Sequence, residues 1–158
     1  MEARLNPFKA SPKGYEAMSA LSHFADSCGI ERPLLELVKM RASQINGCAY
    51  CLDMHSKDAR ALGETEQRLY LLNAWREAPF YSDRERAALE WTEAVTLVAQ
   101  SQVSDGVYER VKPHFTPEEL ANLTLAIITI NGWNRLSIAF RAKPGSYKSP
   151  LQPLKASA

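Results

Sequence analysis

The sequence lacks the features that usually mark membrane proteins and nucleic-acid-binding proteins. Its longest apolar-rich stretch, residues 120–130, is interrupted by Asn122, Thr124 and Thr129, so it is too polar to cross a bilayer. With 19 Lys and Arg against 18 Asp and Glu, the net charge is only +1 and provides no global field to attract nucleic acid or anionic lipid. The N-terminal residues lack the apolar core of a secretory signal. We therefore expect a cytoplasmic protein with no membrane or nucleic-acid partner.

Strand signals are also scarce, and helix signals dominate the chain. The 158 residues suffice for one domain with its own core. The clearest helix starts are two capping boxes, Ser82 with Glu85 and Thr116 with Glu119. Apolar spacing, caps and terminal glycines predict helices over about 12–28, 32–46, 48–63, 65–76, 82–98, 104–113 and from 116 to about 136. The prediction is an all-α, single-domain bundle of about six to seven helices over residues 1–142, followed by an extended C-terminal tail over 143–158.

Cysteine is rare and unevenly placed. The three cysteines are Cys28, Cys48 and Cys51, an odd number that excludes a simple disulfide scaffold. In a reducing compartment a close CxxC pair is more often redox-active or metal-binding than structural. Cys28 lies near a predicted helix end and is interpreted as a packed thiol. The chemistry of this protein therefore depends on what Cys48 and Cys51 do.

The region around the CxxC pair predicts a cluster of reactive side chains. Asn46-Gly47 ends one helix, so Cys48 lies at the N-terminus of the next, where free N–H groups and the helix dipole favour a thiolate. Cys51 follows one turn later and His55 four residues after that, so the three side chains share one helix face. A histidine there can move protons for a reacting thiol. Glu36, on the preceding helix, could orient His55, although nothing local fixes it there.

A metal site is the main alternative to redox chemistry. Two cysteines, His55 and Glu36 could form a tetrahedral zinc site, and the protein would then be a zinc-stabilised, non-catalytic oligomeric scaffold. Structural zinc sites usually recruit a second Cys or His pair, and the sequence offers none, which favours redox chemistry. A third interpretation, in which the two cysteines are small buried hydrophobic residues, is less favoured because a helix start precedes them and a histidine follows.

The remaining polar and aromatic candidates carry weaker signals. His23 and His114 have no partner at ligand spacing and are interpreted as surface or cap residues. Residues 39–41, with two basic side chains, are interpreted as a solvated edge, with a basic residue that raises the nearby thiolate population as the alternative. The 133–135 segment (Trp-Asn-Arg) is interpreted as a capped or interfacial helix end, with a pocket lining or a subunit contact as the alternatives. Tyr50 either packs over the thiols or gates them.

With these residues in hand, the chain resembles the alkylhydroperoxidase D-like, or carboxymuconolactone decarboxylase-like, superfamily. The resemblance covers roughly residues 34–141 and is strongest over ELVKMRASQINGCAYCLDMHSKDARALG and the later NGWNRL segment. The specific pattern is a glutamate twelve positions before the first cysteine, then CxxC, then a histidine four positions after the second cysteine. The resemblance implies an all-α fold, peroxidase activity through the cysteine pair and assembly into trimers or hexamers.

The resemblance also implies a role for each residue of the cluster. Cys51 would be the peroxidatic thiol, Cys48 the resolving thiol, and His55 with Glu36 the proton relay. The helix dipole by itself favours Cys48 as the more acidic thiol, but His55 is better spaced for Cys51. The best-described peroxidase of the family has a histidine directly before the second cysteine, where this chain has Tyr50, and it is longer, with a duplicated helical half.

The sequence therefore predicts an antioxidant thiol peroxidase that reduces hydroperoxides and needs no cofactor. The expected partners are a hydroperoxide substrate, an external dithiol reductant (a dihydrolipoyl or thioredoxin-like protein) and further copies of the same chain. The alternatives are a disulfide reductase that uses the same residues and the zinc-stabilised scaffold. The decarboxylase branch uses the fold without a cysteine pair, so the CAYC segment argues against that reaction here.

Overall fold

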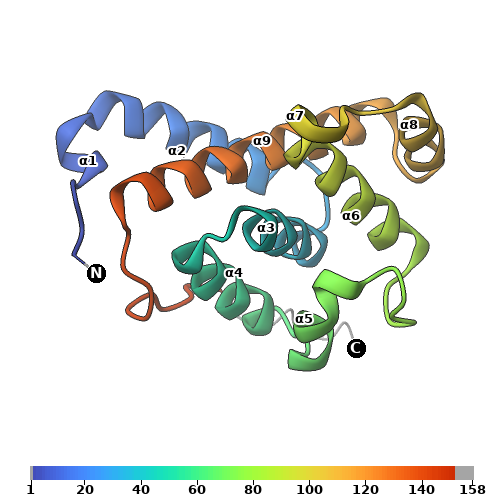
Figure 1. The fold of residues 1–158 in the computed structure, drawn as a ribbon, viewed down its shortest axis with the longest axis horizontal. Helices are drawn as coiled ribbons and strands as arrows, with labels where there is room; N and C mark the ends of the chain where they lie inside the picture. Colours follow the sequence, from blue (N-terminus) through green and yellow to red (C-terminus); the bar gives the residue numbers. More distant parts are fainter. Residues whose placement is uncertain (1, 152–158) are drawn as a thin grey trace.

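The computed structural model describes residues 2–151, which contain helices and irregular connections but no strand (Figure 1). The elements in chain order are α1 (Pro7–Ala10), α2 (Pro12–Asp26), α3 (Arg32–Asn46), α4 (Ala49–Ala61), α5 (Glu66–Leu71), η1 (Leu72–Ala74), α6 (Asp83–Thr96), α7 (Val98–Ser101), α8 (Asp105–Val111), η2 (Lys112–His114) and α9 (Pro117–Phe140). The predicted all-α, single-domain fold is confirmed.

Helix starts follow the capping signals of the sequence. The Ser82 and Thr116 side chains each accept a hydrogen bond from the backbone N–H three residues later, and the Glu85 and Glu119 side chains bond back to complete both boxes. Ser104 caps α8 in the simpler one-way form. Because these bonds satisfy N–H groups that a helix leaves without partners, short polar motifs suffice to locate the starts.

The seven predicted helices are all present, but several differ in extent. Two one-turn helices, α1 and α7, were not predicted, because four residues carry no usable periodicity. The predicted 65–76 helix tightens into the 3₁₀ turn η1, and the predicted 82–98 helix is interrupted at Leu97, where the backbone leaves the helical region. The last helix runs on to Phe140.

Helix α3 lies at the centre of the molecule and packs against α4, α6 and α9 (Figure 1). It is buried on most of its circumference, through Leu34, Leu35, Glu36, Leu37, Val38, Lys39, Met40, Ala42 and Ser43. Helices α2 and α9 run side by side along one side of α3, and α4 lies against another. The two buried charged residues of α3, Glu36 and Lys39, must therefore find their partners inside the protein.

Both ends of the described chain are tied to the helices. The Arg4 N–H donates to the carbonyl of Phe140 at the end of α9 (3.1 Å). Residues 142–151 have no regular structure and lie along α4, where the Gly145 N–H donates to Asp53 (2.9 Å) and the Lys57 ammonium donates to the carbonyl of Tyr147 (3.1 Å). The rest of the predicted tail, 152–158, lies outside the described residues. Between residues 2 and 151, no helix has both the length and the apolar character needed to span a bilayer.

Candidate active site

The turn between α3 and α4 places the two cysteines. Gly47 ends α3 in the left-handed conformation (φ 69°), which a glycine adopts without steric cost. Cys48 follows as the N-cap of α4, its N–H bonded to the carbonyl of Ser43 (3.0 Å) and its sulfur accepting from the Cys51 N–H (3.3 Å). The sequence prediction of Cys48 at a helix N-terminus is therefore confirmed.

Cys48 and Cys51 are joined by a disulfide across this first turn, with their Cα atoms 5.4 Å apart. Each cysteine is only 1% exposed, so neither sulfur protrudes from the surface. Cys51 nevertheless lines a cavity of about 350 Å³, together with His55, whereas Cys48 does not. The second cysteine of the motif is thus the one that a small molecule in the cavity can meet.

Glu36 and His55 come together although they lie on different helices. The imidazole Nδ1 of His55 lies 2.8 Å from a carboxylate oxygen of Glu36, and both side chains are buried. The structure thus places Glu36 beside the histidine that it was expected to orient. The four residues singled out from the sequence form two bonded pairs, Cys48–Cys51 and Glu36–His55, and one member of each pair, Cys51 and His55, lines the cavity.

The charge state of Glu36 decides how His55 is held. Burial alone would raise the pKa of Glu36, but the hydrogen bond from His55 and the positive charge of Lys39 outweigh it, so the pKa falls to about 2. Because an ionised carboxylate can only accept hydrogen bonds, the proton of the shared bond belongs to Nδ1 of His55. Nε2 is then the imidazole nitrogen left to exchange protons.

Two basic side chains of α3 neutralise Glu36 from the side away from His55. The Lys39 ammonium lies 2.9 Å from Glu36 and 2.6 Å from Asp26 of α2, and Arg32 lies 3.4 Å from Glu36. Lys39 is 7% exposed, so the interpretation of residues 39–41 as a solvated edge was wrong. A buried carboxylate at the centre of the molecule requires a buried cation, and helical spacing of three residues supplies it.

Two further polar residues of the site were missed from the sequence. Asp58 is buried on α4 and accepts hydrogen bonds at both oxygens from the Tyr147 hydroxyl (2.9 and 3.0 Å). Burial and this bond raise the pKa of Tyr147, so its phenol stays protonated. Asp58 continues the stripe of Cys51 and His55 by one more turn, a spacing that could have identified it. Tyr147 lies 89 positions away from Asp58, and no local signal links the two.

Aromatic residues form part of the cavity wall. Tyr50 and Trp133 pack against the cluster that contains the two cysteines, and Trp133 makes an edge contact with Tyr15 (5.1 Å between ring centroids). All three line the cavity, as does Tyr147. Because α9 continues past this point to Phe140, the interpretation of residues 133–135 as a helix end was wrong, and their pocket-lining alternative holds for Trp133.

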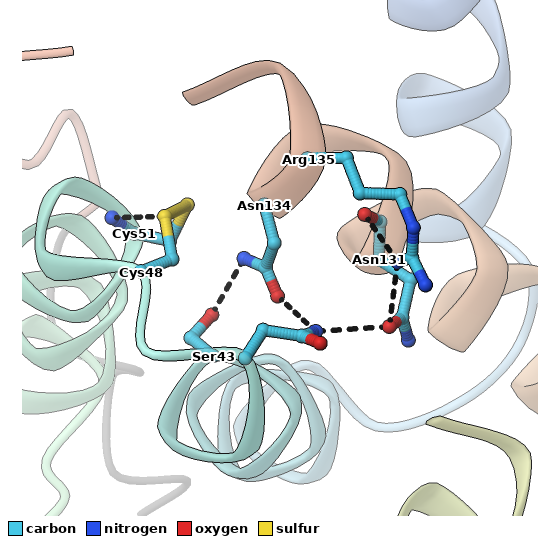
Figure 2. Close-up of a disulfide and its surroundings, with 7 residues drawn as sticks. Ser43, Cys48, Cys51, Asn131, Asn134 and Arg135 are labelled. Atoms are coloured by element: carbon cyan, nitrogen blue, oxygen red, sulfur yellow. Dashed lines mark hydrogen bonds between the residues drawn. A yellow bond between two sulfur atoms is a disulfide. The ribbon is translucent and has the colours of Figure 1, made fainter. Parts of the chain in front are cut away.

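Amide side chains lie beside the disulfide and connect α3 to α9 (Figure 2). The fully buried Asn134 donates to Ser43 (3.0 Å) and accepts from Asn46 (2.8 Å), which also donates to Asn131 (2.9 Å). Arg135 closes the network by donating to the carbonyl and side-chain oxygens of Asn131. Since Asn46 is the last residue of α3, these bonds hold the turn from which Cys48 projects.

The geometry gives little support to a zinc site. Within residues 2–151, the side chains whose potential ligand atoms approach one another closely are Glu36, His55 and Asp58, all within 4.8 Å. Neither cysteine belongs to this group, and the two sulfurs are bonded to each other. Glu36 is also already paired with Lys39 and Arg32, whose positive charges oppose a metal cation. The cluster is better suited to moving protons than to binding a metal.

The remaining candidates from the sequence lie outside this cluster. Cys28 is half-buried, packs against the main core and donates its S–H to the carbonyl of Ala25 (3.1 Å). His23 is an exposed residue at the edge of the cavity, and His114 lies in η2, far along the chain from the cysteines. None of the three contacts the disulfide.

Comparison with known proteins gives the family. Residues 12–94, just over half of the chain, match the model of the carboxymuconolactone decarboxylase family. The chain is 44% identical over 146 residues to the uncharacterized protein YdfG of Bacillus subtilis, covering 92% of this chain and 99% of YdfG. A crystal structure from Agrobacterium tumefaciens, of a protein of unknown function that has been proposed to be the antioxidant defence protein AhpD, superimposes with a TM-score of 0.89 at 42% identity, covering 92% of this chain and all of that one.

A more distant structure shows the same fold. The debrominase Bmp8, crystallised both alone and, as a cysteine variant, with 2,3,4-tribromopyrrole, has a TM-score of 0.78 to this chain at 19% identity, covering 87% of this chain and 74% of Bmp8. At that identity the similarity concerns the fold only. The family match, the close relatives and the disulfide-bonded CxxC pair lead to one conclusion: this chain belongs to the carboxymuconolactone decarboxylase family, among its AhpD-like members.

Proposed function

We propose that this protein is a thiol peroxidase that reduces hydroperoxides with Cys51 as the nucleophile and Cys48 as the resolving thiol. One observation carries the proposal: Cys51 and His55 line the same cavity, and Cys48, which does not line it, is bonded to Cys51 in a disulfide. A nucleophilic thiol, a proton-transferring group and a resolving thiol are the three parts that peroxide reduction by cysteine requires.

The chemistry balances with these residues, the hydroperoxide and an external dithiol. The Cys51 thiol passes its proton to Nε2 of His55, and the thiolate attacks the terminal oxygen of the hydroperoxide. The O–O bond breaks, Cys51 becomes a sulfenic acid, and the alcohol leaves with the proton returned by His55. The Cys48 sulfur then attacks the Cys51 sulfur, and water leaves as the disulfide forms. An external dithiol reduces the disulfide in two exchange steps and is itself oxidised.

Glu36 serves this cycle without touching the substrate. It accepts the hydrogen bond from Nδ1 of His55 and stays ionised, which fixes the imidazole tautomer and leaves Nε2 for proton transfer. The positive charge that appears on the imidazole is then paired with a carboxylate. Glu36 and His55 therefore act as one relay.

Access favours Cys51 over Cys48 as the attacking sulfur. Cys48 is the N-cap of α4 and gains most from the helix dipole, yet it does not line the cavity, whereas Cys51 does. A low pKa does not help a thiolate that the peroxide cannot reach. We therefore assign the nucleophile by access.

Access also favours a hydroperoxide over a protein disulfide as the substrate. A protein disulfide must bring its sulfur to an exposed attacking sulfur, and each cysteine here is 1% exposed. A small hydroperoxide, or the flexible arm of a dihydrolipoyl group acting as reductant, can enter a cavity of about 350 Å³. Assembly into trimers or hexamers and a cytoplasmic location remain predictions from the sequence.

The proposal is tested by a single turnover without any reductant. Protein reduced with dithiothreitol and desalted is mixed with one equivalent of hydrogen peroxide or tert-butyl hydroperoxide, and the CAYC peptide is followed by mass spectrometry. We expect two hydrogens to be lost from this peptide for each peroxide consumed, with Cys28 unchanged. Peroxide consumption no faster than that of a Cys51→Ser variant would exclude the proposed activity.

A further inference from the structure

Asp58 is a buried carboxylate that the proposed reaction does not use. It lies on α4 one turn beyond His55 and is 5% exposed. Over residues 2–151 no Lys or Arg pairs with it, and the donor to its side chain is the Tyr147 hydroxyl. Burial of a carboxylate without a cation costs free energy. Its position therefore calls for a role beyond packing.

The side chain of Asp58 lies close to those of His55 and Glu36. Potential ligand atoms of Glu36, His55 and Asp58 all lie within 4.8 Å of one another. The charge of Glu36 is largely offset by Lys39 and Arg32, so Asp58 brings the less compensated negative charge to this cluster. A positive charge that forms on His55 during the reaction is thus flanked by two carboxylates.

Tyr147 reaches this cluster from the segment after α9. Its carbonyl accepts from Lys57 (3.1 Å), and two residues earlier the Gly145 N–H donates to Asp53 (2.9 Å), so two bonds to α4 hold the segment. The Tyr147 hydroxyl donates to both oxygens of Asp58, and Tyr147 also lines the cavity. The phenol stays protonated and is a permanent donor.

We propose that Asp58 is a positioning residue for His55, with its carboxylate held in place by the Tyr147 hydroxyl. The proposal rests on the assignment of His55 as the proton acceptor of Cys51. When Cys51 transfers its proton, the new imidazolium gains the field of Asp58 in addition to that of Glu36. This raises the fraction of Cys51 present as thiolate at neutral pH. The C-terminal segment is thereby part of the active site.

Other charged groups face the same cavity and have to be kept constant in a test. Asp26 and His23 approach from α2, and Arg32 and Lys39 from α3. Asp26 pairs with both Lys39 (2.6 Å) and Arg32 (3.2 Å), and His23 is exposed at the edge. An Asp58→Asn variant leaves all of these groups in place. Its amide oxygen still accepts from Tyr147, so it removes the charge and preserves the shape.

The test measures thiol activation and not peroxide turnover. Reduced protein is alkylated with iodoacetamide from pH 5 to 10, and the rate at Cys51 is determined by peptide mass spectrometry. For Asp58→Asn we expect alkylation at pH 7 to slow about tenfold, the effect of losing one nearby charge, with the midpoint moved to higher pH. At pH 10, where Cys51 is a thiolate in both proteins, the alkylation rate of Asp58→Asn should equal that of the unmodified protein. A misfolded site would instead change the rate at pH 10 as well.

Tyr147→Phe tests the link between the two residues. It keeps the ring and removes the hydroxyl, and we expect alkylation at pH 7 to slow about threefold, the loss of one hydrogen bond. The double variant should be no slower than Asp58→Asn, because Tyr147 acts through Asp58. Tyr70→Phe is the matched control: Tyr70 is 68% exposed and donates to Glu66 (2.9 Å), so it loses the same kind of bond without effect on Cys51.

The outcomes are separable. An unchanged alkylation profile in Asp58→Asn overturns the proposal, and multiplied effects in the double variant show that Tyr147 does not act through Asp58. If Asp58→Asn fails to fold, as judged by circular dichroism, an unchanged profile in Tyr147→Phe overturns the proposal instead. Since no peroxide is present, failure of the peroxidase proposal appears only in the single-turnover experiment and leaves the alkylation result intact.

Discussion

Glu36 and His55 lie 19 positions apart on different helices, yet an oxygen of one and Nδ1 of the other are 2.8 Å apart in the interior. The bond ties α3 to α4 and fixes the imidazole at the same time. Because Glu36 also pairs with Lys39, one carboxylate both stabilises the fold and prepares the site. Its charge therefore has consequences for stability as well as for reactivity.

Stability should depend on the ionisation of Glu36. Its pKa falls from 4.5 to about 2 on folding, so the stabilisation is fully present above pH 4.5 and is lost as the pH falls towards 2. Glu36→Gln should lower the free energy of unfolding at pH 7 by about 3 kcal/mol. The difference between variant and unmodified protein should narrow below pH 4.5, as measured by urea unfolding at several pH values. Glu16→Gln, exposed on α2, is the control and should change little. A difference independent of pH would contradict the assignment.

Substitution of Cys48 and substitution of Cys51 should have different effects on the reaction with peroxide. In Cys48→Ser, peroxide should convert Cys51 to a sulfenic acid that persists, because no resolving thiol is present, and dimedone should label it in one equivalent. In Cys51→Ser, Cys48 lies away from the cavity and should not be labelled. Peptide mass spectrometry after brief peroxide treatment reads both results, with Cys28→Ser as the control that behaves like the unmodified protein. Equal labelling of Cys48 and Cys51 in the two variants would contradict the assignment of Cys51 as the nucleophile on the basis of its access to the cavity.

Trp133 should report the redox state of the pair. Its ring packs against the cluster that contains both cysteines, and a neighbouring disulfide quenches indole fluorescence. Reduction with dithiothreitol should therefore increase the emission, and Trp133→Phe should abolish most of the increase. The other two tryptophans, Trp75 and Trp91, belong to separate core clusters, so Trp91→Phe should retain the change. An increase that survives in Trp133→Phe would place the quenched indole elsewhere.

Local signals were sufficient to locate the seven longer helices and the stripe of Cys51 and His55 on α4, although not the one-turn helices α1 and α7. Ser82, Thr116 and Gly47 act on backbone groups a few residues away, so their effect can be read from a short segment of sequence. The Cys51–His55 spacing likewise follows from the helical repeat alone. These parts of the site could be predicted because neither depends on how the helices pack.

The partners across helices could not be read in the same way. The i, i+3 spacing of Glu36 and Lys39 suggests an ion pair. Only the packing of other helices around α3 buries that pair and so makes it important for the charge state of the site. The Asp58–Tyr147 contact joins residues 89 positions apart through a segment without periodicity. Without burial or distance information, both basic and acidic residues resemble those of a solvated face, which is why Lys39 was misassigned.

The amide network beside the disulfide should hold both the fold and the site. Asn134 is fully buried and bonds to Ser43 and Asn46, so Asn134→Ala leaves the Ser43 hydroxyl without this partner and removes one acceptor from Asn46. The expected loss is about 2–3 kcal/mol of unfolding free energy, or roughly 5–10 °C in Tm for a chain of this size. Asn73→Ala, exposed in η1, is the matched control and should shift Tm by about 1 °C or less.

The same variant should slow disulfide closure more than it slows the first attack. Asn46 ends α3 immediately before Gly47 and Cys48, so a loosened Asn46 widens the range of positions open to the Cys48 sulfur, while Cys51 within α4 is less affected. Stopped-flow fluorescence of the reduced protein with excess peroxide should then show a sulfenate phase close to normal and a slower second phase. Equal slowing of both phases would mean that the network supports the cavity as a whole. An unchanged Tm in Asn134→Ala would show that water can replace the hydrogen bonds of the Asn134 amide.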